Sequence, residues 1–144
     1  DVFVVVAGDF NAQPLNQVYS LAMGEKPTME ALEQESMVTP EWLEQRKGWF
    51  PLYEKIYANT TPSFFGKLGS VYSVYTPEFE RGHPKYTNLT DGFYNNIDYI
   101  FHGLRLQPTK LLELDHATYE KEEFLPSSLH ASDHVMLMAE LKFV

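Results

Sequence analysis

The sequence contains no cysteine among its 144 residues. A disulfide scaffold, a thiol nucleophile and a cysteine-ligated zinc or iron–sulfur site are therefore excluded. Long apolar runs are also missing: none approaches the ~20 residues that cross a bilayer, so we expect no membrane-spanning helix and no membrane partner. Positive charge is scarce, with 11 Lys and Arg against 20 Asp and Glu and a net charge of −9. Proteins that coat duplexes are normally basic, so passive nucleic-acid binding is disfavoured.

The chain does contain enough apolar material for one domain. Apolar residues make up 44% and aromatic residues 15% of the sequence, which supports one packed core but not two. Most of the negative charge lies at residues 25–44, with six Glu against one Lys, and at residues 110–123, with five acidic residues against two Lys. We interpret both stretches as solvent-exposed surface. The remainder is nearly neutral and suits a phosphate ligand, especially beside a metal ion.

The sequence begins with a strand that is followed by a helix. Residues 2–7 are a continuous apolar, β-branched run, which predicts a buried central strand that ends at Gly8. A polar turn follows, and Pro14 suits the first turn of a helix that ends at Gly24. Residues 25–66 are irregular. We interpret them as a variable insertion, too short to bury its own core, with helical turns at 29–32 and 41–44.

The remaining pattern predicts short strands. Residues 85–90 and 96–101 predict two strands around the turn Asp91-Gly92. Residues 104–114 predict a strand in which Pro108 indicates an edge or a bulge, and residues 135–143 predict the last strand. Short strands with few helices predict an α/β or α+β sandwich. Six aromatic residues are expected in the core or in a groove wall: Tyr53, Tyr57, Phe64, Phe65, Tyr72 and Tyr75.

Four polar groups stand next to apolar strands, at residues 8–11, 86–88, 97–100 and 132–134. Each is ambiguous alone. Asp9 follows a strand, where a carboxylate is commonly a helix cap or a turn residue. Asp98 lies inside an apolar strand and needs a partner, because an unpaired buried charge is costly. His134 begins a strand, where a lone histidine is either structural or catalytic.

Together the four groups suit the hydrolysis of a phosphate ester. An aspartate that is paired with a histidine fixes the ring tautomer and raises its proton affinity. An Asp with an Asn two positions further on can face one ligand from a turn. Carboxylates and imidazole bind hard cations, a base orients water, and amide and hydroxyl donors hold phosphate oxygens.

Three of these groups carry a family resemblance. Gly8-Asp9-Phe10-Asn11, Ile97-Asp98-Tyr99-Ile100 and Ser132-Asp133-His134, in this order, resemble the C-terminal motifs of the exonuclease/endonuclease/phosphatase (DNase I-like) superfamily. Residues 85–93, 97–101 and 125–128 resemble its CCR4-type branch of deadenylases and 2′,5′-phosphodiesterases. The resemblance covers residues 2–23 and about 68–144, and it implies a DNase I-like two-sheet β-sandwich flanked by helices.

The resemblance also implies catalytic and metal-binding roles. Asp9 is expected to orient or activate the attacking water and to bind Mg²⁺, or alternatively Mn²⁺, together with Asn11. Asn11 is also expected to touch the scissile phosphate. Asp98 is expected to pair with His134, which would stabilise charge on the phosphate directly or through the metal. Asp133 is expected to be a metal ligand or to orient the site.

Three further residues are implied to bind substrate. Thr87 and Asn88 are expected to hold the phosphate backbone. Phe93, five residues before Asp98 as in the deadenylases, is expected to stack on a base. A position in the hydrophobic core is the alternative for Phe93.

The resemblance is partial. The family's magnesium-binding Glu, an Asn and a second His lie upstream of the G-D-x-N motif, whereas only eight residues precede Asp9 here. We therefore expect residues 1–144 to be the C-terminal half of a domain, with an incomplete metal site. The N-terminal half of the same domain is then the expected partner.

The resulting hypothesis is a magnesium-dependent 3′-exoribonuclease that shortens single-stranded poly(A)-like RNA and releases 5′-AMP. We expect it in the cytoplasm, with the nucleus or mitochondrion as alternatives. A DNA endonuclease or an inositol polyphosphate 5-phosphatase stays open, although the only basic residues near Thr87 are Arg81 and Lys85. A non-catalytic fragment that keeps an RNA-binding groove also stays open.

Overall fold

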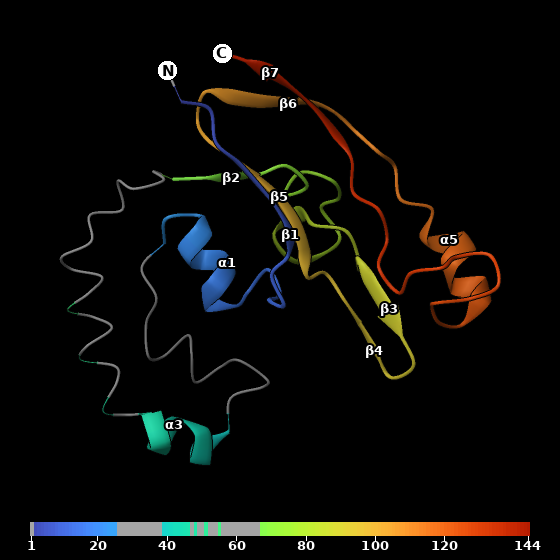
Figure 1. The fold of residues 1–144 in the computed structure, drawn as a ribbon, viewed down its shortest axis with the longest axis horizontal. Helices are drawn as coiled ribbons and strands as arrows, with labels where there is room; N and C mark the ends of the chain where they lie inside the picture. Colours follow the sequence, from blue (N-terminus) through green and yellow to red (C-terminus); the bar gives the residue numbers. More distant parts are fainter. Residues whose placement is uncertain (1, 26–38, 47, 49–50, 52–54, 56–66) are drawn as a thin grey trace.

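The computed structural model describes residues 2–25, 39–46, 48, 51, 55 and 67–144 (Figure 1). The described strands form three small antiparallel sheets, with the orders β1-β5-β2, β3-β4 and β6-β7. In the described part of the chain, no helix is both long and apolar enough to cross a membrane. The strands are β1 (Val5–Asp9), β2 (Gly69–Ser70), β3 (Asn88–Thr90), β4 (Phe93–Asn95), β5 (Asp98–His102), β6 (Leu106–Leu111) and β7 (Ala139–Phe143). The α-helices are α1 (Gln17–Ala22), α3 (Pro40–Arg46) and α5 (His116–Tyr119), with 3₁₀ turns at Glu80–Gly82 and Glu120–Glu122.

Strand β5 separates two hydrophobic clusters, because its alternating side chains point to opposite faces of the sheet. Tyr99 and Phe101 are buried on the face that α1 covers, where they pack with Tyr19. Ile100 points the other way and packs against a second cluster. That cluster contains Val71, Tyr72, Tyr86, Leu89, Leu114, Leu125 and Val135. The sheet is therefore covered on both faces in Figure 1, by α1 on one side and by the strands and loops after residue 70 on the other.

Strand β1 spans Val5–Asp9, two to three residues later than the predicted run 2–7, and it is more exposed than that run predicts. It pairs along one edge with β5, and within the described residues no strand pairs with its other edge. Val6 packs against the α1 cluster, whereas Val5 is 51% exposed. The open edge of such a strand presents unpaired N–H and C=O groups. β1 is therefore incompletely covered, both along this edge and on the face that carries Val5.

The hairpin prediction was wrong in its second strand. The turn Asp91-Gly92 pairs β3 with β4, so that Thr90 lies opposite Phe93. Gly92 has φ +81°, a left-handed conformation that suits glycine. The predicted strand 96–101 exists as β5, but it pairs with β1 and β2 instead. Because the turn contains only two residues, residues 93–95 form the second strand of the hairpin. Asn96 and Ile97 then connect this strand to β5 in the next sheet.

The last two strands form as a pair, and β6 has a register shift between Pro108 and Lys110, as the bulge prediction required. β7 begins at Ala139 and not at residue 135, because residues 133–135 pair with the start of β3. The hydroxyl oxygen of buried Tyr72 lies 3.0 Å from the Leu112 carbonyl oxygen and 3.0 Å from the Met138 carbonyl oxygen, and its proton is shared between them. These contacts attach the end of β6 and the start of β7 to the core.

The helix signals are confirmed in part where the structure describes them. Helix α1 ends before Gly24, which has φ +73°, but it starts at Gln17 and not at Pro14, because the Gln13 N–H donates to Asn16 Oδ1 in a preceding turn. Helix α3 begins at Pro40, and the Thr39 hydroxyl accepts from the Trp42 N–H at 3.1 Å. Several predictions lie outside the described residues, namely the helical turn at 29–32 and the positions of Tyr53, Tyr57, Phe64 and Phe65.

Candidate active site

The β1–β5 pairing places two carboxylates opposite each other. Asp9 ends β1, Asp98 begins β5, and the two are register partners. Directly opposed residues of an antiparallel pair carry their side chains on the same face of the sheet, about 5 Å apart at Cβ. Two like charges at this distance destabilise the pair unless a positive group lies beside them.

His134 supplies such a group from a distant part of the chain. A single antiparallel bridge joins it to Asn88 at the start of β3. Two backbone hydrogen bonds hold the bridge: the Val135 N–H donates to the Thr87 carbonyl at 2.7 Å, and the Leu89 N–H donates to the Asp133 carbonyl at 3.0 Å. The motif at 132–134 is thereby attached to the strand that carries the motif at 86–88.

Three side chains form a continuous hydrogen-bonded chain. His134 Nδ1 lies 2.9 Å from Asp98 Oδ2, and because a carboxylate only accepts, the Nδ1–H donates. The Thr87 hydroxyl donates to the same Oδ2 at 2.7 Å. With Nδ1 on Asp98, Nε2 is the ring nitrogen that remains to contact a substrate. The Thr87–Asp98 hydrogen bond and the Asp98–His134 pair together fix the tautomer and the direction of the ring.

The charges around His134 favour its protonated form. Partial burial lowers the pKa of the imidazole, but the hydrogen bond and the charge of Asp98 raise it more, with further help from Asp133 and Asp9. The net result is a pKa above the usual value of 6.5. His134 is therefore suited to hydrogen-bond an anionic phosphate oxygen from its Nε2–H.

The raised pKa predicts a pH dependence of stability. The stabilising effect of protonating His134 is fully present below pH 6.5 and is lost as the pH rises through the pKa of the folded state. We expect the free energy of unfolding to fall more between pH 6 and pH 8 in the wild type than in His134→Gln. Urea unfolding of both intact proteins at the two pH values measures this difference. Equal falls, or an imidazole NMR titration of His134 below 6.5, would contradict the assignment.

Thr87 differs from its predicted role as a phosphate ligand. Its side chain is 0% exposed, so no phosphate can reach it. The hydroxyl is also saturated: it donates to Asp98 and accepts from the Ile97 and Asp98 N–H groups at 3.0 Å each. Thr87 is therefore a positioning residue for Asp98. The sequence prediction missed this because the N–H groups arrive from a strand ten residues further on.

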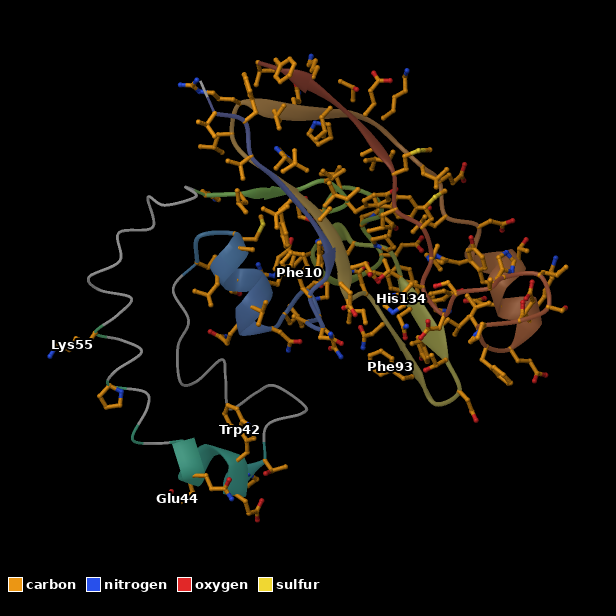
Figure 2. All side chains as sticks on the ribbon, viewed as in Figure 1. Phe10, Trp42, Glu44, Lys55, Phe93 and His134 are labelled. Atoms are coloured by element: carbon orange, nitrogen blue, oxygen red, sulfur yellow. The ribbon has the colours of Figure 1, made fainter. Side chains whose placement is uncertain are left out.

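The other two predicted substrate residues differ in exposure. Asn88 is 4% exposed and its amide donates to Asp133 Oδ2 at 3.2 Å, so it orients Asp133 in this structure. Phe93 is 40% exposed on β4, which argues against the alternative of a core aromatic. Figure 2 shows its ring on the same end of the molecule as His134. Its base-stacking role stays a prediction.

The metal-binding roles of Asp9, Asn11, Asp133 and His134 stay predictions, and a His134 ring that is protonated at both nitrogens has no lone pair with which to ligate an ion. Among the described residues, no three His, Asp or Glu side chains form a group that could hold an ion. One Asp9 oxygen accepts from the Asn11 N–H at 2.7 Å, and Asn11 has φ +49°. Carboxylate and amide oxygens suit Mg²⁺, which commonly takes one or two protein carboxylates together with waters and phosphate oxygens. Asp9 and Asn11 thus offer suitable donors but no complete cage.

The comparisons with known proteins identify several relatives. The chain is 32% identical over 143 residues to "Carbon catabolite repressor protein 4 homolog 4" of Arabidopsis thaliana, covering 96% of this chain and 27% of that protein. It is 29% identical over 143 residues to "2′,5′-phosphodiesterase 12" of Homo sapiens, covering 97% of this chain and 19% of that protein. It is also 31% identical to the "CCR4-Not complex 3′-5′-exoribonuclease subunit Ccr4" of Coccidioides immitis. No protein-family model matches the chain.

A solved structure supports the fold. The chain aligns with ANGEL2, a 2′,3′-cyclic phosphatase crystallised with adenosine-2′,3′-vanadate, at a TM-score of 0.61 and 25% identity. The alignment covers 98% of this chain and 45% of that one. The predicted fold class, an α/β sandwich of antiparallel sheets with few helices, is confirmed. The chain spans between 16% and 27% of the curated relatives named above.

Proposed function

We propose, from the premise that this chain is a partial member of the CCR4-type branch of the exonuclease/endonuclease/phosphatase superfamily, that it belongs to a magnesium-dependent phosphodiesterase. In this proposal the intact protein releases 5′-AMP from the 3′ end of single-stranded poly(A)-like RNA. The observation that carries it is the hydrogen-bonded chain Thr87–Asp98–His134, which lies opposite Asp9.

The proposed reaction is a hydrolysis. A water oxygen forms a bond to the phosphorus, the bond from phosphorus to the 3′ oxygen breaks, and that oxygen leaves with a proton as the new 3′ hydroxyl. The Asp9 carboxylate orients the water by accepting its proton in a hydrogen bond. The His134 Nε2–H donates to a phosphate oxygen as negative charge develops there. Asp98 keeps the ring in the required tautomer and direction.

Magnesium dependence is part of the proposal. Asp9 and Asn11 are the residues that would hold the ion on this side of the site, since their oxygens are hard donors on one turn. When bound, the ion would supply positive charge for the phosphate. Further ligands would come from a segment that packs on β1, whose second edge is unpaired among the described residues and whose Val5 side chain is exposed.

A second candidate is the hydrolysis of a 2′,3′-cyclic phosphate or a 2′,5′ linkage. It is favoured by the alignment of ANGEL2 with 98% of this chain and by the likeness to the phosphodiesterase relative. The same water, carboxylate and imidazole would serve all three esters, because each reaction breaks one bond from phosphorus to a ribose oxygen.

The test uses the intact protein and three matched oligoadenylates, with 3′,5′ linkages, with 2′,5′ linkages and with a 2′,3′-cyclic end. We expect 5′-AMP release from the first with Mg²⁺, loss of activity in EDTA and recovery when Mg²⁺ is restored. A preference for the second or third substrate would replace the proposed substrate. Full activity in EDTA would reject the metal dependence. No hydrolysis of any of them, nor of abasic duplex DNA or inositol phosphates, would support the non-catalytic alternative.

A further inference from the structure

The segment that leads into His134 is a closed loop of residues 125–133. Both of its ends are bound to the backbone of Leu89 on β3: the Leu125 N–H donates to the Leu89 carbonyl at 2.9 Å, and the Leu89 N–H donates to the Asp133 carbonyl at 3.0 Å. Compact surface loops with adjoining ends of this kind are frequently functional. Figure 1 shows the 125–133 loop in orange-red beside α5. Because His134 follows directly, the conformation of this loop bears on where the imidazole lies.

A side-chain turn fixes the middle of the loop. The Ser127 N–H donates to the His130 carbonyl at 2.8 Å. The Ser127 hydroxyl oxygen accepts from the Leu129 N–H at 3.1 Å and from the His130 N–H at 3.0 Å. Serine hydroxyls stabilise tight turns in this way. The backbone that carries the His130 ring is therefore defined by local hydrogen bonds.

The His130 ring contacts the segment that precedes the loop. Its Nδ1 lies 3.0 Å from Glu122 Oε1, and because a carboxylate only accepts, the Nδ1–H donates. The ring also packs at a steep angle against Tyr119, with the two centroids 4.8 Å apart. The Glu122 side chain is only 13% exposed. The Ser127 hydroxyl and then the His130 ring hold the pKa of Glu122 below its ordinary value, although burial raises it.

We propose that the hydrogen bond between Glu122 and His130 is a clamp that sets the conformation of the 125–133 loop, and thereby the positions of Asp133 and His134. A largely buried carboxylate is costly without partners, and here its partner is a side chain in the middle of this loop. Glu122 and His130 are positioning residues, because they act on the site through the backbone of the loop. A small displacement of a reacting group by a distant change can lower the rate considerably. The effect on hydrolysis rests on the proposed function, whereas the effect on the loop does not.

The first measurement is amide hydrogen exchange in the intact protein. Glu122→Leu removes the acceptor for the His130 Nδ1–H. We expect exchange at Leu89, whose N–H holds the end of the loop, to become about tenfold faster, a typical result of losing one hydrogen bond to a charged group. Exchange at Val71 should stay unchanged, because its N–H donates to the Ile100 carbonyl in the core and reports overall stability.

The second measurement is steady-state hydrolysis by the same protein. We expect Glu122→Leu to lower kcat by about tenfold and to change KM by less than about twofold, because the clamp does not contact substrate. Glu122→Gln keeps an oxygen that accepts from His130, so it should restore most of both kcat and the slow exchange at Leu89.

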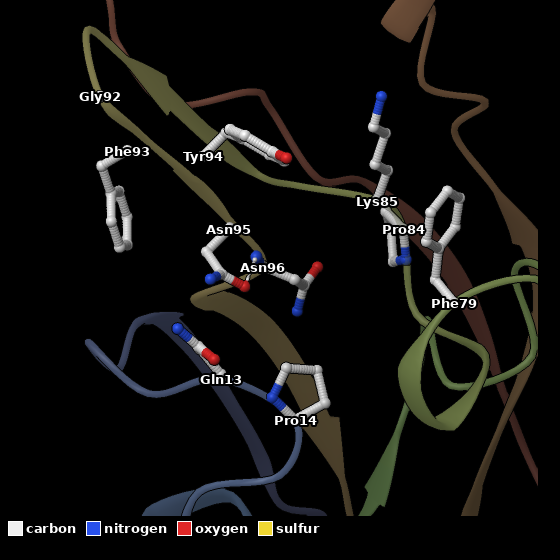
Figure 3. Close-up of a pocket in the computed structure, with 10 residues that line it drawn as sticks. All are labelled: Gln13, Pro14, Phe79, Pro84, Lys85, Gly92, Phe93, Tyr94, Asn95 and Asn96. Carbon is white, nitrogen blue, oxygen red and sulfur yellow. Dashed lines mark hydrogen bonds between the residues drawn. The ribbon is translucent and has the colours of Figure 1, made fainter. Parts of the chain in front are cut away.

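Glu120→Leu is the matched control. Glu120 lies on the same 3₁₀ turn as Glu122, but it forms its ion pair with Lys85, at 2.6 Å. Lys85 lines a separate pocket, and none of the lining residues drawn in Figure 3 belongs to residues 119–134. The control thus loses an ion pair on the same turn, and we expect wild-type exchange at Leu89 and a kcat within about twofold of the wild type.

His130→Phe tests the clamp from its other side. Phenylalanine keeps a ring against Tyr119 but cannot donate to Glu122, so this variant should reproduce the effects of Glu122→Leu, and the double variant should be no worse than either single one. If Glu122→Leu does not fold, His130→Phe decides the question. Unchanged exchange at Leu89 in the folded variants would overturn the proposal, as would faster exchange in an active enzyme with unchanged kcat. Faster exchange in an intact protein that hydrolyses no phosphodiester would retain the clamp and reject only the proposed function.

Discussion

Asp98→Asn is expected to lower the rate of phosphodiester hydrolysis by the intact protein by about 10²–10⁴-fold. The amide keeps the size of the side chain but loses the charge that raises the pKa of His134. An amide NH₂ also competes for the position in which Asp98 Oδ2 now accepts from both His134 Nδ1 and the Thr87 hydroxyl. The imidazole should then be neutral near pH 7 and less firmly oriented, so that it stabilises the developing charge poorly.

The measurement is kcat and KM across pH 5.5–8.5, with thermal unfolding as a check on folding. The drop should appear mainly in kcat, because the expected interaction strengthens in the transition state. Asp91→Asn is the matched control: it makes the same chemical change at an exposed turn residue outside the site, and the turn accepts either residue. Activity of Asp98→Asn within threefold of the Asp91→Asn control would show that the Asp98–His134 pair is structural.

Much of the local structure follows from single residues. Gly24 and Thr39-Pro40 set the ends of helices through backbone conformation and a side-chain cap, effects that involve only neighbouring residues. Pro108 indicated an irregular strand because proline has no N–H to donate, and the register shift lies beside it. These features could be predicted because their causes lie within a few positions of sequence.

Strand pairing was predicted less well, because it depends on partners far away in sequence. Asp91-Gly92 indicated a hairpin, but β5 pairs with β2 and with β1, which lies about ninety residues earlier. The apolar run at residues 2–7 predicted a strand, but β1 spans Val5–Asp9, and its burial depends on what covers its second edge.

Thr87→Val is expected to reduce the free energy of unfolding by about 2–4 kcal/mol and to lower kcat as well. Valine has the shape of threonine but leaves the Ile97 and Asp98 N–H groups without the oxygen to which they now donate. Each unpaired buried group costs about 1–3 kcal/mol. Asp98 also loses the hydrogen bond that holds Oδ2 toward His134, so the same substitution disturbs the site.

Equilibrium urea unfolding and steady-state kinetics of the intact protein separate this role from phosphate binding. Thr87→Ser keeps the hydroxyl and should restore most of both the stability and kcat. Thr90→Val is the matched control on the same strand, because its hydroxyl makes one weaker hydrogen bond, to the Phe93 carbonyl at 3.2 Å; we expect less than about 1 kcal/mol there. If Thr87→Val has wild-type stability and only its KM is raised, Thr87 binds the substrate, as the sequence predicted. A loss shared between stability and kcat would instead mean that one buried hydroxyl links the folding of β5 to the direction of the imidazole.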